Sequence, residues 1–160
     1  MFNLERIRPA HEAAVLAFEL ANRAYFSNFI SDRGDDYFEQ FPVHFRELLA
    51  EQEARTGAYY VLVDEERAVV GRFNLYRLRD DAAEVGFRVA QRVSGQGVTT
   101  SVLGDLCRLA RDEYGLGRVT AMASEKDVAS RRVLEKAGFV PVGPVRVAGK
   151  PGISYERSLG

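Results

Sequence analysis

A turn with two closely spaced glycines is the part of this sequence that most clearly suggests chemistry. The turn runs from Arg92 to Thr100, after a strand-like run and before a long amphipathic stretch. Because Gly95 and Gly97 have no side chains, an anion can approach the backbone there, where the free N–H groups and the dipole of a helix N-terminus attract it. We therefore predict a phosphate or pyrophosphate site. The residues assigned to it are Arg92, Val93, Ser94, Gly95, Gln96, Gly97, Val98, Thr99 and Thr100.

Two common phosphate-binding motifs do not match this turn. A dinucleotide-binding turn needs a third glycine, within a βαβ unit, at the position that Thr100 occupies. A P-loop ends in Gly-Lys followed by Ser or Thr, and no such sequence closes the turn. A Gly-x-Gly turn alone is weak evidence, because glycine is also common in ordinary turns. The identity of the bound group therefore depends on the rest of the chain.

Composition indicates one domain without a polyanionic partner. The chain has 160 residues, 46% of them hydrophobic, and a net charge of -1. This length supports one sizeable core, so we expect one domain over residues 1–160. The near-neutral charge favours neither nucleic acid nor an anionic membrane as a partner. No apolar run is long enough to span a bilayer, and the N-terminal residues lack a signal-peptide pattern, which predicts a cytoplasmic protein.

Cysteine and histidine are not placed to bind a metal. Cys107 is the single cysteine and falls on the apolar face of a predicted helix, so we expect a buried thiol and no intrachain disulfide. His11 and His44 lie on predicted helices without partners at metal-ligand spacing. We therefore predict no bound metal.

The pattern of apolar residues predicts a mixed α/β (α+β) fold. Alternation predicts strands, and apolar residues recurring every three or four positions predict helices. Gly57, Gly115 and Gly138 are placed to end helices, and Asp127 to cap the start of one. The predicted order is βααβββαβαββ, with helices packed on a central mixed, mostly antiparallel sheet. The predicted strands are 3–8, 58–63, 68–78, 83–89, 118–124, 139–147 and 153–159, and the predicted helices are 13–24, 37–55, 98–114 and 127–137.

A second motif lies between Asp127 and Phe139. Together with Arg92-x-x-Gly95-x-Gly97, this segment resembles the two signature motifs of the GNAT family of N-acetyltransferases. The predicted element order is also similar to that family, so the resemblance covers nearly the whole chain. The run from Ala82 to Val89 is most similar to members that modify protein N-termini, including the ribosomal-protein alanine acetyltransferases of the RimJ and RimL type.

The resemblance implies that acetyl-CoA is the cofactor. It implies that the backbone of Phe87, Arg88 and Val89 holds the pantetheine arm and that the glycine turn holds the pyrophosphate. It further implies that this strand splays away from the strand at Val119 to Ala123, so that the thioester lies between the two.

The second motif also departs from the family pattern. The resemblance implies that Asp127 and Ser130 contact the cofactor. Asp127 stands where the family usually has asparagine, and a carboxylate accepts hydrogen bonds without donating one, which changes this contact. Leu134 stands where many members have a tyrosine, so the proton donor for the leaving thiolate must be another group.

Acetyl transfer from a thioester to an amine sets the requirements for catalytic residues. The amine must be neutral and held against the carbonyl, the oxyanion needs a stabiliser, and the thiolate needs a proton. We predict that Glu84 is the general base, directly or through water; the alternative is a half-buried sheet carboxylate paired with Arg88. Ser130 is predicted to donate the proton or to contact pantetheine; the alternative is a local helix cap.

The acceptor amine is predicted to bind beside the irregular stretch between the first two helices. Tyr25, Phe29, Asp32 and Tyr37 are its predicted contacts, and the alternative is a solvated acidic loop over core aromatics. Deprotonating an α-amine of pKa about 8 at pH 7 costs about 1 kcal/mol, against about 4 to 5 kcal/mol for lysine. A protein or peptide N-terminal amine is therefore favoured over lysine.

Two other functions agree with the same motifs. An enzyme that acetylates a polyamine or an aminoglycoside would need the same turn to bind its acyl donor. A catalytically silent acyl-CoA sensor would keep the turn without working acid and base groups. For the enzyme, Cys107 gives no reason for a covalent route, so we expect direct attack in a ternary complex, by a monomer or homodimer.

Overall fold

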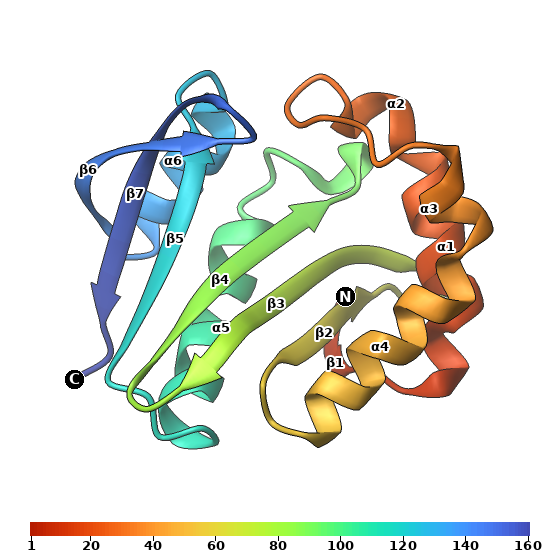
Figure 1. Ribbon diagram of the computed structural model, residues 1–160, viewed down its shortest axis with the longest axis horizontal. Helices are drawn as coiled ribbons and strands as arrows, with labels where there is room; N and C mark the ends of the chain where they lie inside the picture. The colour runs from red at the N-terminus through yellow and green to blue at the C-terminus, as the bar shows by residue number, and fades with distance from the viewer.

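Seven strands form one twisted sheet in the computed structural model, which describes residues 1–160 (Figure 1). The strand order is β1-β2-β3-β4-β5-β7-β6. Only β4 and β5 pair in parallel, and every other neighbouring pair is antiparallel. The predicted mixed, mostly antiparallel sheet is therefore confirmed. The strands are β1 (Asn3–Arg6), β2 (Ala58–Val63), β3 (Val69–Arg79), β4 (Ala82–Val89), β5 (Arg118–Ser124), β6 (Val140–Val147) and β7 (Lys150–Ser158).

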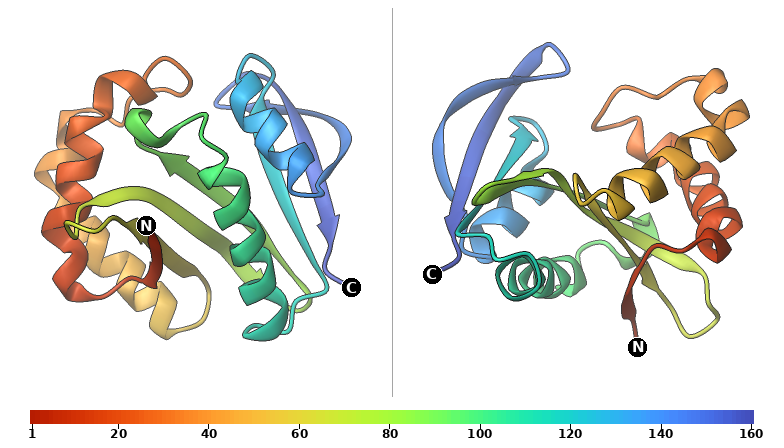
Figure 2. Two further views of the ribbon diagram at one scale, coloured as in Figure 1. Left: turned by 180° about the vertical axis from the view of Figure 1, so that it is seen from behind. Right: turned by 60° about the horizontal axis from the view of Figure 1, so that its bottom comes forward.

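The helices form two groups around this sheet. Helices α1 to α4 gather on the side of β1, β2 and β3, where α1 packs on β3 and α4 on β2. Helices α5 and α6 lie together behind the sheet in Figure 1 and in front of it in the reversed view of Figure 2. None of the helices is both long and apolar enough to cross a membrane. The helices are α1 (Glu12–Ala21), α2 (Arg23–Phe26), α3 (Asp35–Glu39), α4 (Phe41–Glu53), α5 (Val98–Asp112) and α6 (Val128–Lys136), with short 3-10 turns at Pro9–His11 and Gln91–Val93.

Apolar faces of the sheet and of α5 form the core between them. All six residues of β2 are buried, as expected for a central strand with helices or sheet on both sides. Helix α5 buries the stripe that includes Leu103, Leu106 and Ala110 against the sheet. Cys107 belongs to this stripe and is buried as predicted, and burial raises the pKa of its thiol.

The one parallel pair in the sheet is short. Strands β4 and β5 pair only from Ala82 to Glu84 on β4, opposite Arg118 to Thr120 on β5. Beyond Glu84 the two strands continue without pairing, so the remainder of β4 keeps its partner β3 on one edge and has no strand on the other. The splay that the family resemblance implies is therefore present (Figure 1).

The structure corrects the predicted helices of the first third. The helix predicted over 37–55 is two helices, α3 and α4, that meet at Gln40. Pro42 sits at the start of α4, and its ring nitrogen cannot donate the hydrogen bond that would join the two helices. The helix predicted over 13–24 ends at Ala21, and the short helix α2 follows it. The other boundaries agree with the prediction or differ from it by at most three residues, and the strands predicted over 58–63 and 118–124 match β2 and β5.

Packing of α5 on the sheet predicts a large effect of cavity formation there. We expect Leu106→Ala to lower the free energy of unfolding by about 2 to 5 kcal/mol, because Leu106 is fully buried. The same change at Leu20, which is 49% exposed, serves as the control and should cost about 0.5 kcal/mol or less. Urea denaturation of both variants measures the difference. Equal unfolding midpoints for the two variants would contradict this account of the core.

Candidate functional site

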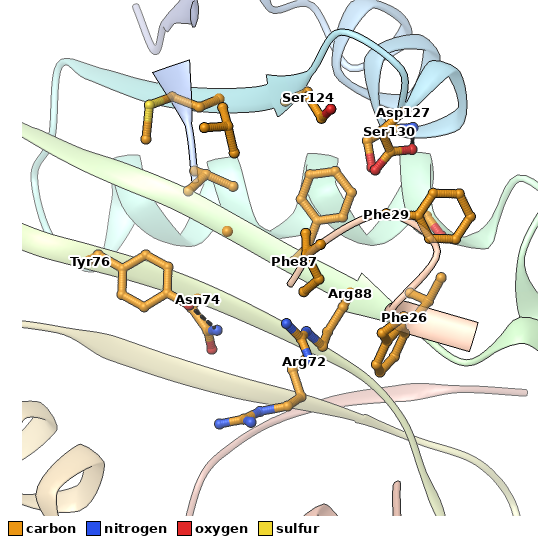
Figure 3. Close-up of a pocket in the computed structure, with 18 of the residues that line it drawn as sticks. Phe26, Phe29, Arg72, Asn74, Tyr76, Phe87, Arg88, Ser124, Asp127 and Ser130 are labelled. Carbon is orange, nitrogen blue, oxygen red and sulfur yellow. Dashed lines mark hydrogen bonds between the residues drawn. The ribbon is translucent and has the colours of Figure 1, made fainter. Parts of the chain in front are cut away.

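One cavity of about 670 Å³ connects the two groups of helices across the sheet. Its floor is formed by β3 and β4, from Arg72 to Tyr76 and from Glu84 to Val89. On one side it reaches helices α2, α3 and α4, and on the other it reaches the glycine turn, the end of β5 and the start of α6. Figure 3 shows side chains of α2, β3, β4, the end of β5 and the start of α6 around the same space. The cavity therefore lies where β4 and β5 part.

The glycine turn presents unpaired backbone amides at one end of this cavity. Gly95 and Gly97 have φ angles of 76° and 78°, in the left-handed region that favours glycine. The amides from Gly95 to Thr100 donate no hydrogen bond within the chain, and the first intrahelical bond of α5 runs from Ser101 N to Gly97 O. No atom lies within 4 Å of the place where a Cβ would stand at either glycine. The turn therefore has both the free donors and the open space that an anion requires.

The predicted residues of this turn have different surroundings. Ser94, Gly95 and Thr99 line the cavity, whereas the side chain of Val93 is buried in the core. The guanidinium of Arg92 lies outside the cavity, where its Nη2 donates to Asp64 Oδ2 over 2.7 Å. A contact between Arg92 and a phosphate therefore requires this ion pair to open. Gln96, Gly97, Val98 and Thr100 do not line the cavity and contribute backbone amides.

The open edge of β4 continues from this turn into the cavity. Phe87, Arg88 and Val89 all line it, on the part of β4 that has no neighbour on its β5 side. The ring of Phe87 stacks on Phe73, with 6.1 Å between the ring centroids, which fixes the strand. An extended ligand would therefore meet free backbone groups along this edge, as an added strand does at a sheet edge.

Asp127 and Ser130 face the cavity from the start of α6. Asp127 is confirmed as the N-cap, because its Oδ1 accepts from the amide of Ser130 over 3.1 Å. The hydroxyl of Ser130 donates to the other carboxylate oxygen over 2.8 Å, and the two side chains lie together in Figure 3. The proton of Ser130 is thus engaged, and the hydroxyl would have to rotate before it could protonate a ligand.

Glu84 lies on the cavity floor at the point where β4 and β5 part. Its side chain is 25% exposed, and its Oε1 accepts from Nη1 of Arg77 over 3.0 Å. Arg88, the partner that alternation suggests, is bonded elsewhere, to Glu19. Because Arg77 is 74% exposed, its ion pair with Glu84 is weak, and the carboxylate stays accessible from the cavity.

Three of the four predicted acceptor contacts lie in the cavity. Tyr25, Phe29 and Tyr37 line it, but Asp32 does not. Both oxygens of Asp32 accept from Arg23, over 2.9 and 2.7 Å, and these hydrogen bonds lower the pKa of Asp32 to about 2. Asp35 binds the same arginine. The structure thus corrects the predicted role of Asp32, because its charge is matched by Arg23 away from the cavity.

Sequence reasoning missed the polar side chains of β3 that point into the cavity. Arg72, Asn74 and Tyr76 alternate with apolar residues in the middle of the strand, and this alternation is the signal that was available. Nδ2 of Asn74 donates to the hydroxyl of Tyr76 over 2.8 Å, while Oδ1 of Asn74 is buried and has no partner (Figure 3). The ring of Tyr76 lies across Gly86, where a Cβ would come within 2.5 Å of it.

A buried ion cluster lies beneath these β3 side chains, and no short sequence motif predicts it. Glu19, on α1, is 2% exposed and accepts hydrogen bonds from Arg72 and Arg88, on β3 and β4. Burial alone would raise the pKa of Glu19, but the two guanidiniums hold it below its ordinary value. The cluster joins α1 to the sheet, because its three members come from three elements far apart in sequence.

The residues present fit coenzyme A. Free amides at the glycine turn suit the pyrophosphate, and the unpaired edge of β4 suits the amide groups of an extended pantetheine arm. The hydroxyl and carboxylate at the start of α6 offer polar contacts on the opposite wall. The pyrophosphate and the pantetheine arm of such a molecule therefore both have matching partners in this cavity.

Comparison with known proteins identifies the family. A profile of the acetyltransferase (GNAT) domain matches residues 2–140. The probable N-acetyltransferase YjcK of Bacillus subtilis is 27% identical over 137 residues, which cover 82% of this chain and 76% of that protein.

Solved structures agree with this assignment at the level of the fold. The ribosomal-protein-S5-alanine acetyltransferase of Vibrio fischeri superposes with a TM-score of 0.91 at 18% identity, covering 98% of this chain and 92% of its own. RimJ of Mycobacterium smegmatis, solved with CoA-disulfide, superposes with a TM-score of 0.86 at 20% identity, covering 98% and 81% of the two chains. With the family profile and the CoA-compatible site, these findings show that the chain belongs to the GNAT family of acetyltransferases and uses acetyl-CoA as its acyl donor.

Proposed function

We propose that this acetyltransferase acts on the N-terminal amine of a protein or peptide by direct attack in a ternary complex. The observation that carries the proposal is that one cavity holds both the free amides of the glycine turn and the accessible carboxylate of Glu84. An acyl donor in the splay and an amine entering from the α2 to α4 side would therefore meet at the floor of that cavity. The likeness in fold to a ribosomal-protein-S5-alanine acetyltransferase supports a protein acceptor.

Different residues along the cavity floor carry out the separate steps of acetyl transfer. Acetyl-CoA supplies an activated acetyl carbonyl, and free backbone N–H groups on the open edge of β4 are the candidates to stabilise its developing negative charge. Glu84 takes a proton from the acceptor amine, directly or through a water molecule. Ser130 holds Asp127 and the start of α6 in place, and its own hydroxyl becomes a proton donor after it turns away from Asp127.

A covalent acyl-enzyme is disfavoured by the position of the thiol. Cys107 is buried within the stripe of α5 that packs on the sheet, and it does not line the cavity. Burial raises the pKa of this thiol, so little of it is the nucleophilic thiolate. Direct attack by the amine needs no such nucleophile.

A small polyamine is the second candidate acceptor. Three carboxylates of the cavity, Glu47, Glu51 and Glu84, lie toward one end of it, and a polycation would be attracted there. One of them is already engaged, because Glu51 accepts a hydrogen bond from the hydroxyl of Tyr59. The cavity also carries arginines, which repel a polycation, and this favours the peptide acceptor.

The acceptor class is tested by a direct product assay. The protein is incubated with acetyl-CoA and, separately, with peptides bearing a free N-terminus, the same peptides with a blocked N-terminus, spermidine and an aminoglycoside. We expect thiol release, and an acetylated product by mass spectrometry, only with the free peptide N-termini. Acetylation of spermidine or the aminoglycoside alone would refute the proposed peptide acceptor. Binding of CoA without any acetylated product would refute the proposal that the protein is an active acetyltransferase.

The anion site predicts a specific sensitivity of Gly97. We expect Gly97→Ala to weaken CoA binding by about tenfold or more, because its φ of 78° is strained for alanine and relieving that strain displaces the free amides of the turn. Gly115→Ala is the matched control, since Gly115 follows the other end of α5 with a φ of 65° and equally open surroundings. Calorimetric titration with CoA compares them. If both variants bind as wild type does, the turn does not hold the phosphates.

The role of Glu84 is tested by removing its charge without changing its shape. We expect Glu84→Gln to retain CoA binding while kcat falls by about a hundredfold, the size of a general-base contribution. Glu113→Gln, just beyond the end of α5 and outside the cavity, is the control and should keep its kcat. Steady-state kinetics with a peptide acceptor measures both variants. A kcat for Glu84→Gln within twofold of wild type would remove Glu84 from the mechanism.

A further inference from the structure

Two arginines of the cavity, Arg72 and Arg88, share a single buried carboxylate, that of Glu19, and a third arginine lies near them. Nη1 of Arg72 donates to Glu19 over 2.8 Å, and Nη1 of Arg88 donates to its other oxygen over 2.9 Å. Arg33 adds a third guanidinium, whose carbon lies 4.6 Å from the centre of the Tyr37 ring and whose Nη1 donates to the Tyr37 hydroxyl. One carboxylate against three guanidiniums leaves a surplus of positive charge.

The surplus charge faces the cavity and not the protein interior. Arg33, Arg72 and Arg88 all line the cavity, whereas Glu19 does not. A guanidinium carries five N–H donors, and the hydrogen bonds to Glu19 use one from Arg72 and one from Arg88. Arg33 is exposed and the side chain of Arg88 is 18% exposed, so their unused donors can reach a ligand, whereas the side chain of Arg72 is only 7% exposed.

The pKa of Arg88 reflects this imbalance. Burial lowers the pKa of its guanidinium, and repulsion from Arg33 and Arg72 lowers it further, so that it stays below its ordinary value although Glu19 lies beside it. An anion placed among the three guanidiniums would offset both effects. A carboxylate or phosphate is the group that such a planar, forked set of donors recognises best.

The charged residues on the floor of the cavity lie along one line. Cross-strand pairs on the face toward α1 to α4 are Tyr76 with Glu84, then Asn74 with Gly86, then Arg72 with Arg88. Successive pairs are about 7 Å apart, so the arginine pair lies about 13 Å from the Glu84 pair. Glu51 also lies toward the Glu84 end, since both residues line a second cavity there, of about 530 Å³. The site is thus acidic where the amine reacts and basic beyond it.

We propose that the arginines Arg33, Arg72 and Arg88 bind an acidic side chain of the acceptor peptide, at the second to fourth position counted from the residue whose amine is acetylated. An extended peptide advances about 3.5 Å per residue, which matches the separation between the Glu84 and arginine ends of the floor. The proposal rests on the peptide acceptor proposed above and narrows it to N-termini followed closely by aspartate or glutamate.

The test compares matched peptides on wild-type and variant enzyme. Each peptide begins with a free alanine amine, ends in an amide and carries one glutamate at the second, third, fourth or eighth position; its partner carries glutamine there. Arg33→Gln is the main variant, because Arg33 is exposed and can be replaced without emptying the core. Arg88→Gln is the second, since it reduces the surplus positive charge and leaves Glu19 paired with Arg72. Arg111→Gln, an exposed α5 residue outside the cavity, is the control.

We expect kcat/KM of wild type to be about tenfold or more higher for glutamate than for glutamine at one of the second to fourth positions, with no preference at the eighth. Arg33→Gln should lose most of that preference and keep its kcat/KM on the glutamine peptides, while Arg111→Gln behaves as wild type. If wild type acetylates glutamate and glutamine peptides equally, the arginine site is refuted and the peptide acceptor stands. If only spermidine or the aminoglycoside is acetylated, both proposals are wrong.

Discussion

The end of hydrogen bonding between β4 and β5 at Glu84 is the constraint on which the site depends. A strand edge with no neighbour exposes amides and carbonyls that need partners, so it either meets water or binds a ligand. Helix α5 connects the two strands, and its N-terminus, with free amides from Gly95 to Thr100, therefore opens at the mouth of the splay. The place for the acyl donor thus follows from the topology, and the two glycines make its backbone reachable.

Charge on the floor of the cavity is the second constraint, and burying it carries a desolvation cost. Replacing a buried ion cluster by apolar side chains is often neutral or stabilising, so packing alone gives no reason for Glu19, Arg72 and Arg88 at this place. Asn74 adds a buried oxygen without a partner on the same wall. Polar groups gathered at such a cost are typical of functional sites. Because these groups run from the acidic Glu84 to the basic arginines, they would orient an acceptor along the floor of the cavity.

The parts of this protein that sequence predicted best are those set by local rules. Asp127 caps α6 because a carboxylate at that position reaches the amide of Ser130, and the glycine turn opens α5 because only nearby residues decide it. Ion-pair partners that only the tertiary fold brings together were not predictable from the sequence. Asp32 and Arg92 carry the charges that their expected roles require. In the structure, however, Asp32 is paired with Arg23, and Arg92 with Asp64. The arginine cluster depends on Glu19, whose partners lie 53 and 69 residues further along the chain.

The most direct test of the account follows the backbone itself during donor binding. In a titration of ¹⁵N-labelled protein with CoA, the central claim predicts that the amide signals from Gly95 to Thr100 shift downfield, as N–H groups do on bonding to phosphate. Signals from Val85 to Val89 should shift with them, and those of β1 and β2 should stay in place. Saturable shifts that leave the glycine turn and the open edge of β4 unchanged would contradict it.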